Sequence, residues 1–131
     1  MSDMPCFVGI DVAKAQLDMA LRPSGERWAV PNDASGVMTL VDRVQARHPT
    51  LMVLEATGGL ERAVTSALAT AGLPVVVVNP RQVRDFARAT GQLAKTDALD
   101  ARALAHFADV IRPTPRPLPD AQTQEIGRAH V

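Results

Sequence analysis

Three segments of this chain are apolar on both faces, and this limits the folds that it can adopt. They are residues 6–12, the segment TLMVLEATGG at 50–59, whose apolar run ends in Glu55, and PVVVVNP at 74–80. Strands that are apolar throughout lie in the middle of a sheet that other elements cover on both sides. The chain is therefore expected to form a sheet between helices.

The remaining segments complete this sheet and supply its cover. QLDMALRP (16–23) alternates apolar and polar residues, and RWAVPN (27–32) follows a turn, so residues 6–32 predict an antiparallel meander. Apolar residues at helical spacing predict helices that start near residue 35, at 60–71, at 81–89 and at about 97–111. The order β-β-β-α-β-α-β-α-α predicts an α/β fold with a mixed five-stranded sheet flanked by helices.

The composition excludes some classes of protein. The 131 residues have no net charge, so overall charge indicates neither the presence nor the absence of a nucleic-acid partner. One cysteine, Cys6, excludes an internal disulfide and fits a reducing compartment. No apolar run has the length of a membrane span, and the first residues lack a signal-peptide pattern. We expect a cytoplasmic protein with no membrane partner.

The C-terminal residues differ in kind from the rest. RPTPRPLPD at 112–120 has prolines at alternating positions, which is typical of an extended linker. We expect one domain at 1–111 and a Pro-rich linker at 112–124 towards a C-terminal domain that this chain lacks. The last segment, EIGRAHV at 125–131, equals the translation of a common sequencing adapter in one frame. We expect it to be an artefact with no function.

Four carboxylates stand where the predicted fold would bury them. Asp11 lies within the first apolar strand and Glu55 ends the second one, while Asp97 and Asp100 fall at the start of the last helix. At 100° per residue this pair extends the apolar face made by Leu104, Phe107, Ala108 and Ile111. A plainer interpretation is also open: Glu55 turned to solvent, Thr96 or Asp97 as the N-cap, and Asp100 in the first turn.

The four acids together favour a metal site. Clustered carboxylates repel one another, which raises their pKa values and lowers stability unless a cation is present. Mg²⁺ or Mn²⁺ prefers oxygen ligands, and two such ions about 4 Å apart serve phosphodiester chemistry. Asp11, Glu55, Asp97 and Asp100 are therefore the predicted metal ligands.

A basic stripe precedes the last two acids. Arg81, Arg84 and Arg88 lie at i, i+3 and i+7 on one side of a helix, and Lys95 follows. These residues are predicted to bind a nucleic-acid backbone, although a solvated helix face has the same pattern. His106 could be a ligand, but a lone histidine on such a helix is more often structural. Asp3 and Asp18 are expected to be surface charges.

Three stretches resemble a known family. GIDVAK, LEATGG and VNPRQVRDFARATGQLAKTDALDARALAHFA are similar to the N-terminal DEDD domain of transposases of the insertion-sequence 110 family, over about residues 6–118. The resemblance implies a ribonuclease-H-like (RuvC-like) fold and a catalytic tetrad that falls on the same four acids. It also implies DNA transposition by cleavage and strand transfer, a second domain with a catalytic serine, a guide RNA and oligomers. Leu60 departs from the family, which often has an aromatic residue there.

Other functions remain open at this point. One is a stand-alone RuvC-like nuclease. Another is a non-catalytic nucleic-acid-binding module, in which the acids only cap helices or face solvent. A third is an actin-like ATP-binding domain, because GIDVAKAQLDMAL resembles the first phosphate loop of that fold. Ala13 and Lys14 stand where that loop has small hydroxyl and glycine residues, and no second glycine-rich loop follows.

Overall fold

The predicted five-stranded sheet is confirmed. A computed structural model describes residues 4–91 and 100–114 of the chain. Its strands are β1 (Phe7–Val12), β2 (Gln16–Arg22), β3 (Arg27–Pro31), β4 (Leu51–Glu55) and β5 (Val75–Val78). They form one sheet in the order β3-β2-β1-β4-β5. The first three strands are antiparallel, whereas β4 runs parallel to β1 and β5 parallel to β4. This arrangement is the mixed sheet that the sequence pattern predicts and the ribonuclease-H-like sheet that the family resemblance implies.

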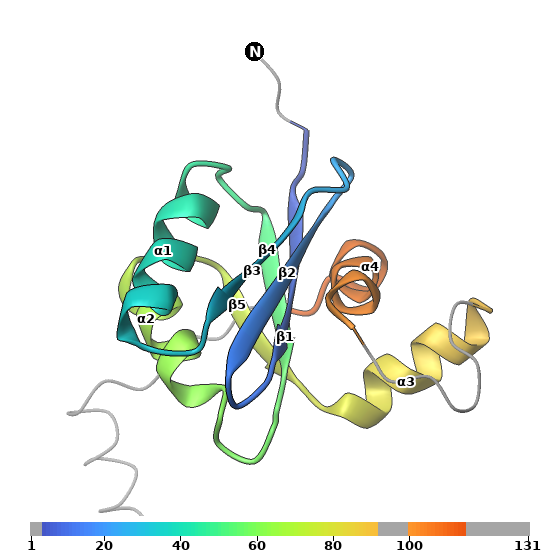
Figure 1. Cartoon of the computed structure of the whole chain (residues 1–131). Coiled ribbons are helices and arrows are strands. Elements are labelled where there is room, and N and C mark those ends of the chain that lie inside the picture. The colour runs from blue at the N-terminus through green and yellow to red at the C-terminus, as the bar shows by residue number, and fades with distance from the viewer. Residues whose placement is uncertain (1–3, 92–99, 115–131) are drawn as a thin grey trace, which may run out of the picture.

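Helices of the described ranges cover both faces of the sheet. They are α1 (Ala34–Gln45), α2 (Arg62–Thr70), α3 (Pro80–Ala89) and α4 (Ala101–Ile111). In Figure 1, α1 and α2 lie on one side of the sheet and α4 on the other, and α3 lies below α4 in this view. None of these helices has the length and apolar character that a membrane span requires.

The two faces of β1 explain why its sequence is apolar throughout. Val8, Ile10 and Val12 point towards α1 and α2, and they belong to a core with Leu40 and Leu68. Alternate residues of a strand point to opposite faces, so Phe7, Gly9 and Asp11 lie on the side of α4. We call this side the α4 face. Its core contains the residues Phe7, Leu51, Val53, Val83, Leu104 and Phe107.

Gly9 allows α4 to lie directly on the sheet. A Cβ atom at this position would be 2.1 Å from the carbonyl oxygen of Ala101 and 2.3 Å from the backbone nitrogen of Ala105. Ala20, which pairs with Gly9 in β2, forms a small buried cluster with these two alanines. Small side chains on both surfaces therefore bring the first turn of α4 within backbone contact of β1.

The start of α4 corrects one prediction. A helix was expected from about residue 97, but α4 begins at Ala101, and Asp100 is its N-cap in an extended conformation. Asp100 therefore precedes the helix and does not extend the apolar face of its first turn. At the other end, Ile111 is 50% exposed and not part of that face. Residues 97–99 lie outside the described residues.

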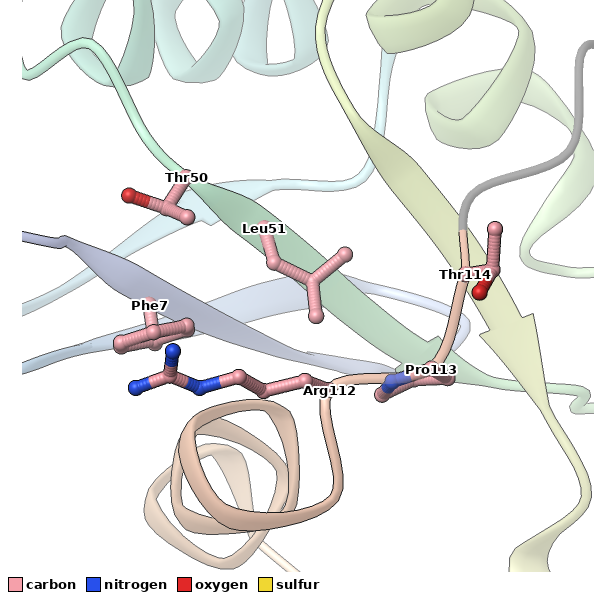
Figure 2. Close-up of a pocket in the computed structure, with 6 residues that line it drawn as sticks. All are labelled: Phe7, Thr50, Leu51, Arg112, Pro113 and Thr114. Atoms are coloured by element: carbon pink, nitrogen blue, oxygen red, sulfur yellow. The ribbon is translucent and has the colours of Figure 1, made fainter.

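The first residues of the predicted linker pack against the sheet. Arg112, with φ 51°, ends α4, and its guanidinium lies 4.9 Å from the centre of the Phe7 ring. A cavity of about 210 Å³ lies beside Phe7 and Leu51. Figure 2 shows Arg112, Pro113 and Thr114 among the residues that line it. This cavity lies at the amino ends of β1 and β4. The rest of the predicted linker and residues 125–131 lie outside the described residues.

The contact at Gly9 generates the first prediction. Gly9→Ala places a methyl group inside the backbone of α4, so we expect the free energy of unfolding to fall by about 3 kcal/mol in urea titrations. Gly72→Ala is the control, since no atom lies within 4 Å of its Cβ and only its positive φ is strained. The control should lose about 1 kcal/mol. Equal losses in the two variants would contradict the packing role of Gly9.

Candidate active site

Two predicted acids meet at one end of the sheet. Asp11 lies near the end of β1 and Glu55 ends β4, and these strands are parallel neighbours in which Ile10 pairs with Leu54. The same register carried one residue further puts Asp11 beside Glu55. Both side chains lie on the α4 face, and both are half-buried. The carboxyl ends of two parallel strands thus bring together acids that are 44 positions apart in the sequence.

A third predicted acid reaches this end of the sheet through α4. Asp100 caps the helix: its Oδ1 accepts a hydrogen bond of 3.0 Å from the N–H of Ala103. Its Oδ2 lies 3.3 Å from a guanidinium nitrogen of Arg102. Because Ala101 rests on Gly9, two residues before Asp11, the capping carboxylate is placed near Asp11. We call Asp11, Glu55 and Asp100 the carboxylate site. Asp97, the fourth predicted acid, lies outside the described residues.

A further acid, which was predicted to be a surface charge, also lies here. Asp18 of β2 is the direct cross-strand partner of Asp11, on the same face, and it is half-buried. Its Oδ1 accepts a hydrogen bond of 2.8 Å from Nε2 of Gln16. The sequence alone gives a weak signal, because the pairing depends on where the turn is centred, and the observed register centres it between Lys14 and Ala15. This register pairs the two aspartates.

The electrostatics show that these acids act on one another. Burial raises the pKa of Asp11, and the charges of Asp18 and then Asp100 raise it further. Burial and the charge of Asp11 likewise raise the pKa of Glu55, while Arg84 lowers it. Oε2 of Glu55 is buried and has no hydrogen-bond partner among the described residues. Negative charge is thus concentrated where little protein charge compensates it.

The carboxylate site fits a divalent cation in the type of its donors and in the unpartnered oxygen of Glu55. The described residues of the site do not by themselves form a coordination sphere. Within residues 4–91 and 100–114, no three His, Cys, Asp or Glu side chains are placed so that they could hold a metal ion together. One oxygen of Asp100 is also occupied by the helix cap.

The predicted basic stripe lies on α3, next to this site. Arg81, Arg84 and Arg88 are all exposed, and Arg84 is near enough to Glu55 to lower its pKa. Phe86, on the other side of α3, contacts the rings of His106 and Phe107 edge-on, with centroids 4.8 and 5.6 Å away. These contacts fix α3 against α4. Lys95 lies outside the described residues.

His106 has the surroundings of a packing residue. It lies on α4 against Phe86, and its Nδ1 is buried without a hydrogen-bond partner among the described residues. Burial and the charge of Arg22 lower its pKa, against a smaller opposite effect of Asp109. A neutral imidazole in an aromatic contact agrees with the structural role expected for it.

The side chain of Glu61 stabilises the glycine-rich turn after β4. Oε1 of Glu61 accepts hydrogen bonds from the backbone N–H groups of Thr57 and Gly59, at 2.9 and 3.0 Å, and from the hydroxyl of Thr57. The hydrogen bond from the Thr57 backbone is the main cause of the lowered pKa of Glu61. This acid fixes the turn that follows Glu55.

The architecture and the acids together define a ribonuclease-H-like α/β domain with a carboxylate site at the ends of its central strands. A family model described as "Transposase", that of the DEDD transposases of insertion sequence 110, matches residues 8–128. The chain belongs to this family.

Two individual proteins are also similar. The pilin gene-inverting protein of Moraxella bovis is 30% identical over an alignment of 107 residues, and this alignment covers 77% of this chain and 33% of the relative. The chain thus spans about a third of the length of this curated relative. Among solved structures, RuvC of T. thermophilus in complex with a Holliday junction substrate gives a TM-score of 0.49 at 20% identity, over 88% of this chain and all of that one.

The raised pKa values predict a pH dependence in metal-free buffer. A group whose pKa is higher in the folded chain keeps its proton where the unfolded chain has lost it, so its contribution to stability falls as pH rises above about 4. Asp11→Asn removes one such group. The variant should gain stability relative to the original chain between pH 4 and pH 7, as measured by urea unfolding in EDTA. A difference that is constant or shrinks over this range would contradict the assignment.

Proposed function

We propose that this chain is the metal-binding catalytic domain of a DNA transposase, acting in phosphodiester cleavage and strand transfer. One observation carries the proposal. Asp11, Glu55 and Asp100 come from three separate elements and meet at one end of a ribonuclease-H-like sheet. Family membership supports a transposase, and the cost of placing unpaired carboxylates together supports a cation.

The proposed ligands are Asp11, Glu55 and Asp100, with Asp97 as the fourth. Mg²⁺ or Mn²⁺ held there would polarise a phosphate oxygen and lower the pKa of an attacking hydroxyl or water. The side chains of the site would supply the oxygen ligands. Glu55 offers a buried oxygen that has no other described partner, and Asp11 stands between the other acids.

The proposed DNA-binding residues are Arg81, Arg84 and Arg88 on α3, followed by Lys95. Exposed guanidinium groups bind backbone phosphates, and Arg84 beside Glu55 would bring a phosphate to the carboxylate site. The relative from M. bovis has a name that describes gene inversion, which also rearranges DNA. By analogy with the family, we also propose that the full-length protein uses a guide RNA, forms a homo-oligomer, is cytoplasmic and has a catalytic serine outside this domain.

A second candidate function is a nucleic-acid-binding module without catalysis. It is favoured by the use of Asp100 as a helix cap and by the lack of three assembled metal ligands within the described ranges. Such a module would bind DNA through α3 with the same salt dependence, but it would not respond to metal.

Metal binding separates these two functions. Mn²⁺ at about ten times its dissociation constant should raise the unfolding midpoint of the chain by about 5 °C in thermal-shift assays. Asp11→Asn and Glu55→Gln should each lose most of this shift, because each removes a proposed ligand. Asp42→Asn, on α1 behind the other face, is the matched control and should keep the shift. No shift in the original chain would favour the non-catalytic module.

The basic stripe predicts the salt dependence of DNA binding. Replacing Arg81, Arg84 and Arg88 with glutamine should make the slope of log K against log salt shallower by about 2.7, if each contacts one phosphate. Fluorescence anisotropy with a labelled duplex measures this slope. Arg27→Gln, exposed on the edge strand β3, is the control and should leave it unchanged. An unchanged slope in the triple variant would place DNA elsewhere.

A further inference from the structure

Three carboxylates form a row across neighbouring strands of the α4 face. Asp18 of β2 pairs with Asp11 of β1, and the parallel register puts Glu55 of β4 on the other side of Asp11. Adjacent strands are about 4.8 Å apart, so successive acids in the row are side-chain neighbours. The row ends with Ala29 of β3 and Val78 of β5, which are the next partners in register.

Nothing in the described structure neutralises Asp18. It has no ion pair among the described residues, and its side chain accepts a hydrogen bond from the amide of Gln16, which orients Oδ1 without adding charge. Like charges directly opposite each other in a sheet lower its stability. The carboxylate of Asp18 opposite that of Asp11 therefore lowers the stability of the metal-free fold.

We propose that Asp18 is a positioning residue of the carboxylate site, whose charge opposes Asp11 when the site is empty and strengthens the binding of a divalent cation at Asp11. This inference rests on the proposed function of the site. On the other side of Asp11, the buried Oε2 of Glu55 has no hydrogen-bond partner among the described residues, which supports a cation beside the row. The hydrogen bond of 2.8 Å from Nε2 of Gln16 orients the carboxylate of Asp18.

If Asp18 has this role, Asp18→Asn should stabilise the metal-free chain and weaken its binding of Mn²⁺. Asp18→Asn should raise the unfolding midpoint of the 131-residue chain in EDTA by about 1 to 5 °C, because it removes the repulsion. The same variant should need at least about ten times more Mn²⁺ for half of the metal-induced shift, as for other residues that support metal ligands. A merely structural role would lower the midpoint in EDTA.

A double-mutant cycle tests whether Asp18 acts through Asp11. In the Asp11→Asn background, Asp18→Asn should change the midpoint in EDTA by less than about 1 °C, because the opposing charge is absent. Asp42→Asn removes one negative charge far from the site and is the control. It should alter neither the midpoint in EDTA nor the Mn²⁺ requirement.

The results separate this inference from the proposed function. A lower midpoint of Asp18→Asn in EDTA, or an unchanged Mn²⁺ requirement while the original chain responds to Mn²⁺, would overturn the role of Asp18 alone. An equal gain from Asp18→Asn with and without Asp11 would also overturn it. No response of the original chain to Mn²⁺ would overturn the proposed function, and with it the role of Asp18 at a cation.

Discussion

The contact between Gly9 and the backbone of α4 determines how this site is built. Because position 9 has no side chain, the carbonyl of Ala101 and the N–H of Ala105 lie where a Cβ atom would be. The start of α4 thus rests on β1, two residues from Asp11, and its capping residue Asp100 reaches the ends of the central strands. A larger residue at position 9 would move α4, and with it the only described acid of the site that does not come from the sheet.

The negative charge of the half-buried carboxylates is the second constraint on this site. Asp11 and Glu55 are half-buried carboxylates with raised pKa values, and their neighbours are mainly other acids. Such an arrangement lowers the stability of the metal-free fold, so the structure is best explained by a function that needs negative charge there. The divalent cation that we propose at this site would turn the mutual repulsion of the acids into attraction to a common ion. The arginines of α3 then present an outward positive surface beside the site.

Much of this could be predicted from the sequence, and the exceptions have physical causes. The apolar runs around Asp11 and Glu55 identify central strands, and parallel central strands bring their carboxyl ends together. The predicted start of α4 was wrong because the position of Asp100 in the sequence fits both a residue within the helix and an N-cap. Only the extended backbone of Asp100 distinguishes the two. Asp18 was missed because its partner is on another strand, so the pairing depends on hairpin register and not on the pattern within one strand.

The central claim is that the acids at this end of the sheet bind a divalent cation. A crystal structure of the chain grown with Mn²⁺, with an anomalous difference map recorded near the manganese absorption edge, tests it most directly. We predict an anomalous peak on the α4 face within about 2.2 Å of carboxylate oxygens of both Asp11 and Glu55. A map in which Mn²⁺ binds elsewhere, or in which these carboxylates stay free at saturating Mn²⁺, would contradict the claim.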